Sequence, residues 1–412
     1  MKILMLSWEY PPRVIGGLAR HVYHVSREIA RNGHEIHVIT CIPENFEKEL
    51  PQHSESVYIH WVHPYDIVTN DFKLWVLHLN MSMIEKAINL ILQTGNFDII
   101  HCHDWMTAYS GKALKHSFRI PLVATIHATE WGRNGGIYNQ TQSYINSVEW
   151  WLNYEAWKVI CCSKYMKNEL QNLFSLPEDK IRIIPNGIEV NTLKDLDIKF
   201  KRSDYASDDE KIIFFIGRLV EEKGVQIALK AMPIVLAENP NVKFVISGDG
   251  PRSPALKKLA SELGIAHKVI FTGYIDDKVR NSLFNASSAA IFPSLYEPFG
   301  IVALEAMAAG VPVIVSDTGG FKEIVDEREN GLKVPPGNPE MLAKAINTIL
   351  ENQILAQKIK AKGLNMVKKR FSWENIAQKT VEVYSETLKE YEHSPWKPFM
   401  KFKSPTTVST RS

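Results

Sequence analysis

The sequence predicts an α/β protein with two doubly wound domains, each a parallel sheet covered by helices on both faces. Short apolar runs rich in Val and Ile alternate with amphipathic segments along the whole chain, which is typical of parallel sheets. At 412 residues the chain is too long for one hydrophobic core. The polar stretch 194–210 has the composition of a linker or surface loop, and it separates two series of such runs.

In the first half, seven apolar runs are expected to be strands. They read KILMLSW, EIHVIT, SVYIHWV, FDIIHCHD, PLVATIH, KVICCS and IRIIPNG. Residues 18–31 and 73–92 show the amphipathic pattern of helices. A third helix, 163–174, is expected to begin with Ser163 as its N-cap. This half is therefore expected to form one doubly wound domain.

In the second half, a new series of strands is expected after the linker. It reads KIIFFIG, VKFVISG, KVIFTG, AAIFPS, PVIVSD and GLKVP. Helices are expected between these strands at 225–237, 254–263 and 278–285. A last amphipathic helix covers 372–391, and the tail after it is rich in Pro, Ser, Thr and basic residues, so we expect it to be mobile.

Composition excludes several classes of function. The 48 Lys and Arg nearly balance the 46 Asp and Glu, which gives no indication of a nucleic-acid surface. The four cysteines show no CxxC spacing and lie in or beside apolar runs, so a reducing, cytoplasmic setting is expected. No apolar stretch approaches the roughly 20 residues of a membrane helix, so we expect neither a secreted nor an integral membrane protein.

The segment EPFGIVALE places a carboxylate, Glu305, in a helix that is otherwise apolar. A buried carboxylate needs a polar partner. The backbone N–H groups of Phe299, Gly300 and Ile301 lie at the positive end of this helix, where an anion such as phosphate is favoured. A phosphorylated, hydroxyl-rich ligand would satisfy both demands. The alternative is a salt bridge from Glu305 to an Arg or Lys, with Glu297 as a turn residue, and the residues alone leave both interpretations open.

Ligands of open α/β sheets bind beyond the carboxyl ends of the strands, so the motifs that follow the strands are site candidates, and the cleft between the domains is the expected site. After the first strand, Gly16 and Gly17 precede a helix and could approach a phosphate closely. A simple tight turn is the alternative for this pair.

Two further strands of the first half end in polar clusters. HCHDW and IHATEWGR contribute His101, His103, Asp104, His127, Glu130 and Arg133. A polar shelf for a sugar, with His127 as a hydrogen-bond acceptor, fits better than a metal site because no tight His or Cys ligand set follows. His101 could equally be a core histidine whose hydrogen bonds are satisfied.

In the second half, Arg218 and Lys223 follow a strand in GRLVEEKG and would suit a diphosphate, although a solvated charged turn is the alternative. Gly248 ends the next strand and allows close backbone approach to a ligand, and Gly273 and Tyr274 could frame a base. The DLD sequence at 195–197 lies in the polar linker, so we interpret it as a solvated loop and expect no metal site.

With these motifs, the chain resembles the retaining glycosyltransferases of family 4, which have the GT-B fold of two Rossmann-like domains facing a central cleft. It is most similar to the glycogen and starch synthase type. The resemblance runs from residue 1 to about residue 377 and rests on EPFGIVALE with its Glu-x7-Glu spacing, GRLVEEKG, PNGI, the Gly16–Gly17 pair and HCHDW.

The resemblance implies a division of the chain. Residues 1–193 would form the acceptor-side domain and 194–371 the nucleotide-sugar domain. Residues 372–392 would be a helix that crosses back to the first domain, and 393–412 a mobile tail.

It also implies roles for individual residues, none of which is a metal ligand. Glu305 would hold the donor ribose, and Glu297 would lie beside the transferred sugar. Arg218 and Lys223 would bind the diphosphate, together with Gly17 and the helix start at Gly300. His127 would line the sugar near its anomeric carbon, and Asp104 would hold a sugar hydroxyl or place the acceptor. The acceptor would attack on the face from which the diphosphate leaves, with a diphosphate oxygen as base.

The expected function is transfer of glucose from ADP-glucose or UDP-glucose to an α-glucan, without a cofactor. A lipid-linked or small-sugar acceptor is an alternative, because the tail with Trp396, Phe399 and Phe402 could touch a membrane surface. A nucleotide-sugar epimerase or a non-catalytic sugar-nucleotide binder is a further alternative. Bacterial glycogen synthases begin with Lys-x-Gly-Gly, whereas here Arg13 precedes VIGG.

Overall fold

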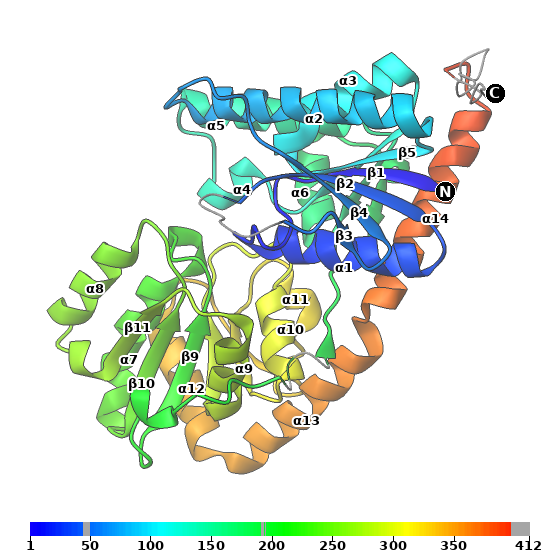
Figure 1. Ribbon diagram of the computed structural model, residues 1–412. Helices are drawn as coiled ribbons and strands as arrows, with labels where there is room; N and C mark the ends of the chain where they lie inside the picture. Colours follow the sequence, from blue (N-terminus) through cyan, green and yellow to red (C-terminus); the bar gives the residue numbers. More distant parts are fainter. Residues whose placement is uncertain (44–49, 191–192, 194, 397–412) are drawn as a thin grey trace. The chain divides into compact units, whose positions relative to one another are not determined.

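The computed structural model describes residues 1–43, 50–190, 193 and 195–396. The chain forms two compact units, which are described separately below. Unit 1 contains Met1–Cys162, Lys167–Ile184 and the C-terminal segment from Trp373, and unit 2 contains Ser163–Met166 and Pro185–Ser372. Each unit is a sheet with helices on both faces (Figure 1).

The sheet of unit 1 has eight strands in its described part, in the order β3-β4-β2-β1-β5-β6-β7-β8. All neighbours pair in parallel except β3 and β4. The strands are β1 Lys2–Leu6, β2 Glu35–Cys41, β3 His53–Ser54, β4 Val57–Val62, β5 Ile99–His103, β6 Leu122–Ile126, β7 Lys158–Cys161 and β8 Ile181–Ile183. The central strands β5 and β6 are buried along their whole length, which explains the apolar run of β6, whereas β5 also buries His101 and His103.

The helices of unit 1 bury their apolar faces on this sheet. They are α1 Gly17–Arg31, α2 Phe72–Thr94, α3 Ala108–Phe118, α4 Glu130–Asn134, α5 Gln140–Glu155, α6 Lys164–Phe174, whose first turn belongs to unit 2, and α14 Trp373–Glu392, with short 3₁₀ turns at Trp105–Thr107 and Glu178–Lys180. Helix α14 packs against α1 in a core that includes Val22, Val25, Ile376 and Tyr384. The last helix of the described chain is therefore part of the hydrophobic core of unit 1.

The sheet of unit 2 is wholly parallel, in the order β11-β10-β9-β12-β13-β14. Its strands are β9 Lys211–Ile216, β10 Val242–Ser247, β11 Val269–Gly273, β12 Ala289–Phe292, β13 Val313–Ser316 and β14 Leu332–Val334. Its helices are α7 Val225–Glu238, α8 Ser253–Glu262, α9 Asp277–Ala286, α10 Ile301–Ala308, α11 Phe321–Ile324, α12 Pro339–Glu351 and α13 Gln353–Arg370, with 3₁₀ turns at Arg202–Asp204, Glu221–Lys223 and Ala266–Lys268.

The strand order changes direction once in each sheet, and this fixes where a ligand can bind. In unit 1, β1 lies between β2 and β5, and in unit 2, β9 lies between β10 and β12. Chain connections leave such a pair of strands in opposite directions, so a crevice opens at their carboxyl ends. The loops after β1 and β5, and those after β9 and β12, are therefore the places to look for functional side chains.

The prediction of two parallel-sheet α/β domains is confirmed, and every predicted strand is present. The two-residue strand β3 and the helices α3, α4, α5, α11, α12 and α13 were not predicted individually. Ser163 caps α6 as expected, because its hydroxyl accepts the N–H of Met166 at 3.1 Å. Residues 397–412, most of the predicted mobile tail, lie outside the described residues.

Two other expectations concern the setting of the protein. All four cysteines are buried, and no disulfide joins them among the described residues, as expected for thiols packed as small hydrophobic side chains. Among the helices that the structure describes, none is both long enough and apolar enough to cross a membrane.

Candidate active site

The carboxylate of Glu305 lies inside unit 2, as its apolar helix predicted. Glu305 is only 6% exposed, and Arg280 from α9 places Nη1 3.2 Å from its Oε1. Arg280 is buried as well and also contacts Asp277 at 2.9 Å. The polar partner predicted for Glu305 is therefore Arg280, as the salt-bridge alternative proposed. A ribose could still reach this pair, because a carboxylate has lone pairs for more than one donor.

Glu297 and Lys223 form a second ion pair at the carboxyl ends of β9 and β12. Lys223 Nζ lies 2.8 Å from Glu297 Oε2, and the Ser294 hydroxyl donates to the same oxygen at 3.2 Å. The Glu297 side chain is 8% exposed and the Lys223 side chain 22%. Glu297 is therefore more than a solvated turn residue, and Lys223 is the partner of the two that remains accessible to a ligand.

Arg218 lies on the same loop after β9 and is more exposed. Its Nη2 is 3.3 Å from Glu222 Oε1, and its side chain is 46% exposed. An exposed pair of this kind contributes little to stability. Arg218 can therefore exchange Glu222 for a ligand anion at small cost.

The start of α10 is held in a fixed conformation. Gly300 has φ 104° and ψ 48°, a left-handed conformation, and a Cβ there would lie 2.3 Å from the Phe321 ring. The loop before it is fixed by two hydrogen bonds, from Gly320 N–H to Glu297 O at 2.8 Å and from the Ser163 hydroxyl to Pro298 O at 2.7 Å. The side chains of Phe299 and, in part, Ile301 are buried. The helix start is thus a rigid backbone surface at the end of β12.

The glycines after β10 and β11 differ from each other. Gly248 has φ +122°, and a Cβ on it would lie 1.9 Å from Gly217 O. Close approach of the neighbouring strand end therefore explains this glycine without any ligand. Gly273 has φ +71° with open space around it, and Tyr274 after it is 77% exposed. Gly273 and Tyr274 remain available to a ligand.

In unit 1, a carboxylate that the sequence analysis did not single out lies at the Gly16–Gly17 turn. Glu9 Oε2 accepts the N–H groups of Ile15 at 2.8 Å and of Gly16 at 3.0 Å. Burial raises the pKa of the Glu9 carboxyl, although these two N–H groups oppose the shift. Gly16 has an extended φ of −156°, and a Cβ on it would meet nothing within 4 Å. The loop thus already holds one anion with its amides, and Gly17 begins α1 directly after it.

His101 is the core histidine that the alternative described. It is fully buried, with Nδ1 2.7 Å from the Tyr384 hydroxyl and Nε2 2.7 Å from Thr125 Oγ1. Burial holds the pKa of His101 well below its usual value, so the ring is neutral. Its two contacts join β5 to β6 and to α14, which is a structural role.

His103 and His127 form a cluster with His21, a residue of α1 that sequence reasoning missed. His103 Nδ1 lies 3.3 Å from His127 Nε2, and His103 Nε2 is buried without a hydrogen-bond partner in the described structure. Burial lowers the pKa of His127 to about 3 and that of His103 well below its usual value. Neutral imidazoles at the end of β5 and β6 can exchange hydrogen bonds with sugar hydroxyls.

This histidine cluster is also the one group among the described residues whose side chains could hold a metal ion. Its nitrogen atoms all lie within 4.8 Å of one another. Nitrogen ligands of a tetrahedral zinc ion lie roughly 3.4 Å apart, because Zn–N distances are about 2.0–2.1 Å, and the 3.3 Å between His103 Nδ1 and His127 Nε2 suits either a hydrogen bond or such a pair of ligands. The sequence analysis did not identify this set of three histidines, because His21 comes from α1, and the expectation of no metal site stays a prediction.

Asp104 and Glu149 are two buried carboxyls with raised pKa values. Asp104 Oδ1 accepts the N–H of His127 at 2.7 Å, and Arg133 Nη2 lies 3.9 Å away. Burial raises the pKa of Asp104 to about 6, against the opposing charge of Arg133. Glu149 on α5 accepts the N–H of Glu130 at 2.9 Å, and burial raises its pKa to about 8. The sequence analysis did not identify Glu149, because α5 was not predicted.

Comparison with known proteins identifies relatives along the whole chain. A model described as Glycosyltransferase Family 4 matches residues 15–192, and one described as Glycosyl transferases group 1 matches residues 197–366. The chain is 41% identical to an uncharacterized glycosyltransferase of Methanocaldococcus jannaschii, over 93% of this chain and 98% of that one. It is 32% identical to the glycogen synthase of Mycobacterium tuberculosis, over 93% and 94% of the two chains.

One more distant relative and two solved structures complete the comparison. A D-inositol 3-phosphate glycosyltransferase of Acidothermus cellulolyticus is 27% identical over 91% of this chain and 86% of its own. Sucrose-phosphate synthase from Thermosynechococcus elongatus superposes with a TM-score of 0.82 at 24% identity, over 95% and 100% of the chains. The catalytic domain of starch synthase IV from Arabidopsis thaliana, bound to ADP and acarbose, gives a TM-score of 0.73 at 18% identity, over 94% and 99%. The expected GT-B fold is thereby confirmed.

Proposed function

Because the chain belongs to glycosyltransferase family 4, we propose that it transfers glucose, with retention of configuration, from a nucleotide-diphosphate sugar to an α-glucan. Unit 2 would bind the nucleotide sugar and unit 1 the acceptor. The observation that carries the proposal is the set of two ion pairs, Lys223–Glu297 and Arg280–Glu305, built behind neighbouring strand ends of unit 2. They supply the charges and hydroxyl acceptors that a sugar nucleotide requires.

Lys223 and Arg218 are assigned to the donor diphosphate. Both cations lie on the loop after β9, and both already face carboxylates, so each would exchange its partner when the diphosphate binds. Arg218 offers a planar fork of donors and Lys223 a compact charge. When the glycosyl bond breaks, negative charge develops on the leaving diphosphate, and fixed cations there stabilise the transition state. Once Lys223 contacts the diphosphate, the Glu297 carboxylate would accept a hydrogen bond from a hydroxyl of the transferred sugar.

Glu305 is assigned to the ribose hydroxyls. Its carboxylate is fixed by Arg280 at 3.2 Å, so the side chain is held in place before the ligand arrives. The N–H groups at the rigid start of α10, at Gly300 and Ile301, favour the adjacent phosphates. Gly273 and Tyr274 would lie beside the base. Gly248 is not needed for this purpose, because packing of the strand ends accounts for it.

In unit 1, His127 and Asp104 are assigned to the sugar. Their positions are coupled, because the Asp104 carboxylate accepts the backbone N–H of His127 at 2.7 Å. The neutral His127 ring would line the sugar near its anomeric carbon, and Asp104 would hold a hydroxyl. The amides at Gly16 and Gly17 would approach a phosphate if Glu9, which now accepts the N–H of Gly16, turned away.

The reaction would need no nucleophile from the protein. The bond between the anomeric carbon and the diphosphate oxygen breaks, and the acceptor hydroxyl oxygen attacks the anomeric carbon on the same face. The acceptor proton moves to the departing diphosphate oxygen, which acts as the base. The residues of the protein would hold both reactants on one face of the sugar and neutralise charge, which is the largest contribution expected in a reaction of this kind.

Two relatives bear on the acceptor and the donor. The glycogen synthase of Mycobacterium tuberculosis, at 32% identity, supports an α-glucan acceptor. Starch synthase IV binds ADP and acarbose, which supports a nucleoside diphosphate in unit 2 and a glucan-like ligand. A small acceptor is the second candidate, because the chain is also 27% identical to a D-inositol 3-phosphate glycosyltransferase.

The proposal is tested by incubating the protein with ADP-glucose or UDP-glucose and glycogen. We expect incorporation of glucose, equal release of nucleoside diphosphate, and an α-anomeric signal for the new linkage in NMR spectra. Absence of incorporation with both donors would exclude the α-glucan proposal. Incorporation into inositol phosphate but not into glycogen would favour the small acceptor, and isomerised sugar nucleotide without acceptor would indicate an epimerase.

A further inference from the structure

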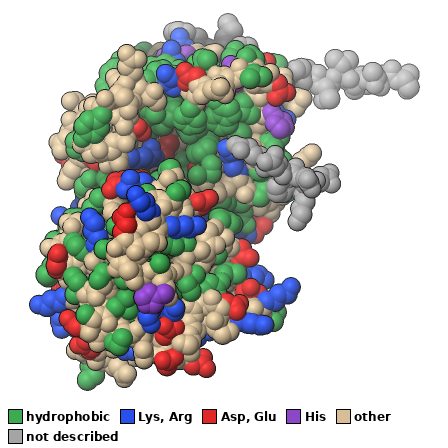
Figure 2. All heavy atoms as spheres, turned by 90° about the vertical axis from the view of Figure 1, so that its left-hand side faces the viewer, with side chains coloured by type: hydrophobic (Ala, Val, Ile, Leu, Met, Phe, Trp, Pro, Cys, Tyr) green, Lys and Arg blue, Asp and Glu red, His purple; other side chains and the backbone are tan. Residues whose placement is uncertain are grey.

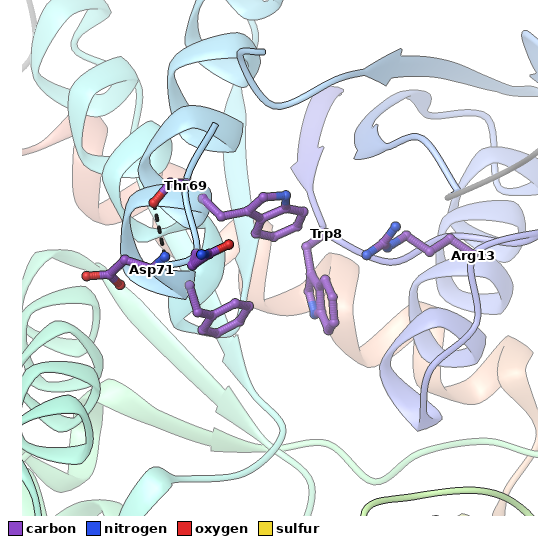
Figure 3. Close-up of a pocket in the computed structure, with 7 residues that line it drawn as sticks. Trp8, Arg13, Thr69 and Asp71 are labelled. Carbon is purple, nitrogen blue, oxygen red and sulfur yellow. Dashed lines mark hydrogen bonds between the residues drawn. The ribbon is translucent and has the colours of Figure 1, made fainter. Parts of the chain in front are cut away.

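A pocket of about 290 Å³ lies wholly within unit 1, between the loop after β1 and the start of α2. Trp8 comes from the first, and Phe72 and Trp75 from the second. In Figure 3, Arg13 points toward Trp8 from one side, while Thr69 and Asp71 lie on the other side of the pocket. Small-molecule sites usually occupy roughly 300–1,000 Å³. This pocket therefore has the size for about one sugar ring, not for a long chain.

The aromatic side chains of the pocket are held in place by contacts with each other and with a cation. Phe72 and Trp75 stack with ring centroids 6.0 Å apart and an angle of 9° between the planes. Arg13 places its guanidinium 5.3 Å from the Trp8 ring and 5.9 Å from the Trp75 ring. Such cation–π contacts are most favourable with Trp. The pocket thus presents flat apolar faces whose orientation is fixed before any ligand binds.

Polar groups lie at the rim of the same pocket. Asp71 is the N-cap of α2 and accepts the Lys73 N–H at 2.8 Å, and its own N–H donates to Thr69 Oγ1 at 3.0 Å. The Asp71 carboxylate is exposed, and its Oδ2 lies 3.6 Å from Lys73 Nζ, in a partly exposed pair that a ligand hydroxyl can replace at small cost. Arg13 Nη1 donates to Ile42 O at 3.1 Å. The guanidinium of Arg13 lies against the two Trp rings. Aromatic faces beside a carboxylate suit a ligand with hydroxyl groups, and the charge of Asp71 is balanced by Arg13 and Lys73 nearby.

The pocket lies close to the candidate active site of unit 1. The Phe72 ring packs edge-on against Trp105 with centroids 6.1 Å apart, and Trp105 directly follows Asp104. On the opposite wall, Trp8 precedes Glu9, whose carboxylate accepts the N–H of Gly16. One wall of the pocket therefore belongs to the loop after β1, and the other wall contacts the loop after β5 through Phe72.

Figure 2 shows one face of unit 1 in the upper part of the view. Hydrophobic side chains gather there, whereas Lys, Arg, Asp and Glu side chains are spread over the visible face of unit 2. Phe72 is 48% exposed. Half-exposed aromatic side chains around a hollow are more typical of a binding site than of a packed core.

We propose that this pocket is an acceptor subsite, in which a pyranose ring of an α-linked gluco-oligosaccharide stacks between Trp8 and the Phe72–Trp75 pair and donates a hydroxyl to Asp71. This inference rests on the proposed function and deepens it, because it names the part of the protein that recognises the acceptor. The sugar would be neutral, and the residue that reacts would lie toward Asp104. Arg13, which differs from the Lys-x-Gly-Gly pattern, would orient Trp8.

The inference is tested with Phe72→Ala, because this side chain is half exposed and its loss leaves the core intact. Binding of maltotetraose to the full chain without donor is followed by tryptophan fluorescence. We expect the affinity to fall by about tenfold in the variant, and the acceptor KM in the transfer assay to rise by a similar factor, with donor KM unchanged. The matched control is Trp150→Ala, which removes an exposed ring of a stacked pair, Trp150–Tyr154, elsewhere in unit 1.

The outcomes separate this inference from the proposed function. Transfer to glycogen with equal acceptor KM for the Phe72 and Trp150 variants would overturn the subsite and leave the function standing. Maltotetraose binding that depends on Phe72, without transfer from either donor, would support the subsite and refute the function. Tighter binding of a sugar phosphate than of maltotetraose, again dependent on Phe72, would overturn the assignment to a neutral sugar. Asp71→Asn gives a second readout, and we expect it to weaken binding of maltotetraose less than Phe72→Ala does.

Discussion

The strand ends of the two units carry different kinds of polar groups. In unit 1 they carry neutral imidazoles and carboxyls with raised pKa values, such as His127 and Asp104. In unit 2 they carry ion pairs, Lys223–Glu297 at 2.8 Å and Arg280–Glu305 at 3.2 Å. In unit 1, neutral imidazoles lie beside a carboxyl that accepts a backbone N–H, whereas in unit 2 opposite charges pair directly.

This difference teaches how each unit can receive a ligand. A neutral hydrogen-bonded cluster can exchange partners with the hydroxyls of a sugar, and no charge has to be removed from water. A preformed ion pair can release its cation to a stronger anion, because the carboxylate has already oriented it. A sugar nucleotide contains both parts, a neutral hexose and a charged diphosphate. The following predictions test or sharpen this division, starting from the largest expected effect.

Lys223→Ala should lower the rate of glucose transfer by roughly 100- to 1,000-fold, as removal of a single transition-state contact commonly does. The rate of nucleoside diphosphate release from ADP-glucose or UDP-glucose, in the presence of glycogen, measures this. Lys258→Ala is the control, because Lys258 forms an exposed pair with Glu262 at 3.5 Å on α8. Equal rates for the two variants would contradict the role of unit 2 as the charged half of the site.

Glu305→Ala should lower the free energy of unfolding by about 3 kcal/mol, because it removes the buried carboxylate beside Arg280 and leaves that charge with Asn281 and the more exposed Asp277. Urea unfolding followed by circular dichroism measures this. Replacing both Arg280 and Glu305 with Met should recover most of the loss, since no charge is then left unpaired. Glu305→Gln should also lose the thermal stabilisation given by the nucleotide sugar. A normal donor-induced shift in Glu305→Gln would show that the ribose assignment is wrong.

Glu149→Gln should change how stability depends on pH. Burial raises the pKa of Glu149 to about 8, whereas a carboxyl in the unfolded chain titrates near 4.3. The folded state therefore holds a proton that the unfolded state releases, so the stability of the wild type falls as pH rises from about 4 to 8. The variant lacks this pH dependence. Its free energy of unfolding, relative to that of the wild type, should therefore rise by up to about 1.4 kcal/mol per pH unit between pH 6 and 8. If the difference between the urea-unfolding midpoints of the variant and the wild type is the same at pH 6 and pH 8, the raised pKa of Glu149 is contradicted.

Asp104 should give the acid limb of the activity profile. The ionised carboxylate accepts hydrogen bonds from the His127 N–H and from a sugar hydroxyl more strongly than the protonated acid does, and burial raises its pKa to about 6. The value of kcat/KM should therefore fall as pH drops through about 6, by about tenfold between pH 7 and 5. Asp104→Asn should be less active and should lack this limb. Persistence of the limb in Asp104→Asn would assign it to another group.

Much of the fold could be predicted because strands and linkers leave local signals. Continuous Val and Ile runs marked β5 and β6, and both proved to be buried along their whole length. Helix α5 left a weaker signal, since its apolar residues Ile145, Val148 and Leu152 alternate with many polar ones. The position of α5 depends on its packing against α3, and the local sequence pattern does not reveal that contact.

The candidate site could be predicted only in part, for the same reason. Strand-end residues such as Asp104, Lys223 and Glu297 could be located because the fold class says where strand ends meet. Their partners could not. Arg280 reaches Glu305 from 25 positions away in sequence, and His21 meets His103 from another element. The burial of Glu305 predicts a cationic partner. Only the tertiary structure, which brings α9 beside α10, determines that this partner is Arg280.

The measurement that tests the division between the units most directly is ligand affinity at two salt concentrations. Dissociation constants of UDP or ADP and of maltotetraose are determined for the wild type by calorimetry, at about 0.05 and 0.5 M NaCl. Salt screens accessible charges, so the nucleoside diphosphate should bind several-fold more weakly at high salt, while maltotetraose affinity stays constant. An equal salt dependence for both ligands, or none for the diphosphate, would contradict the account.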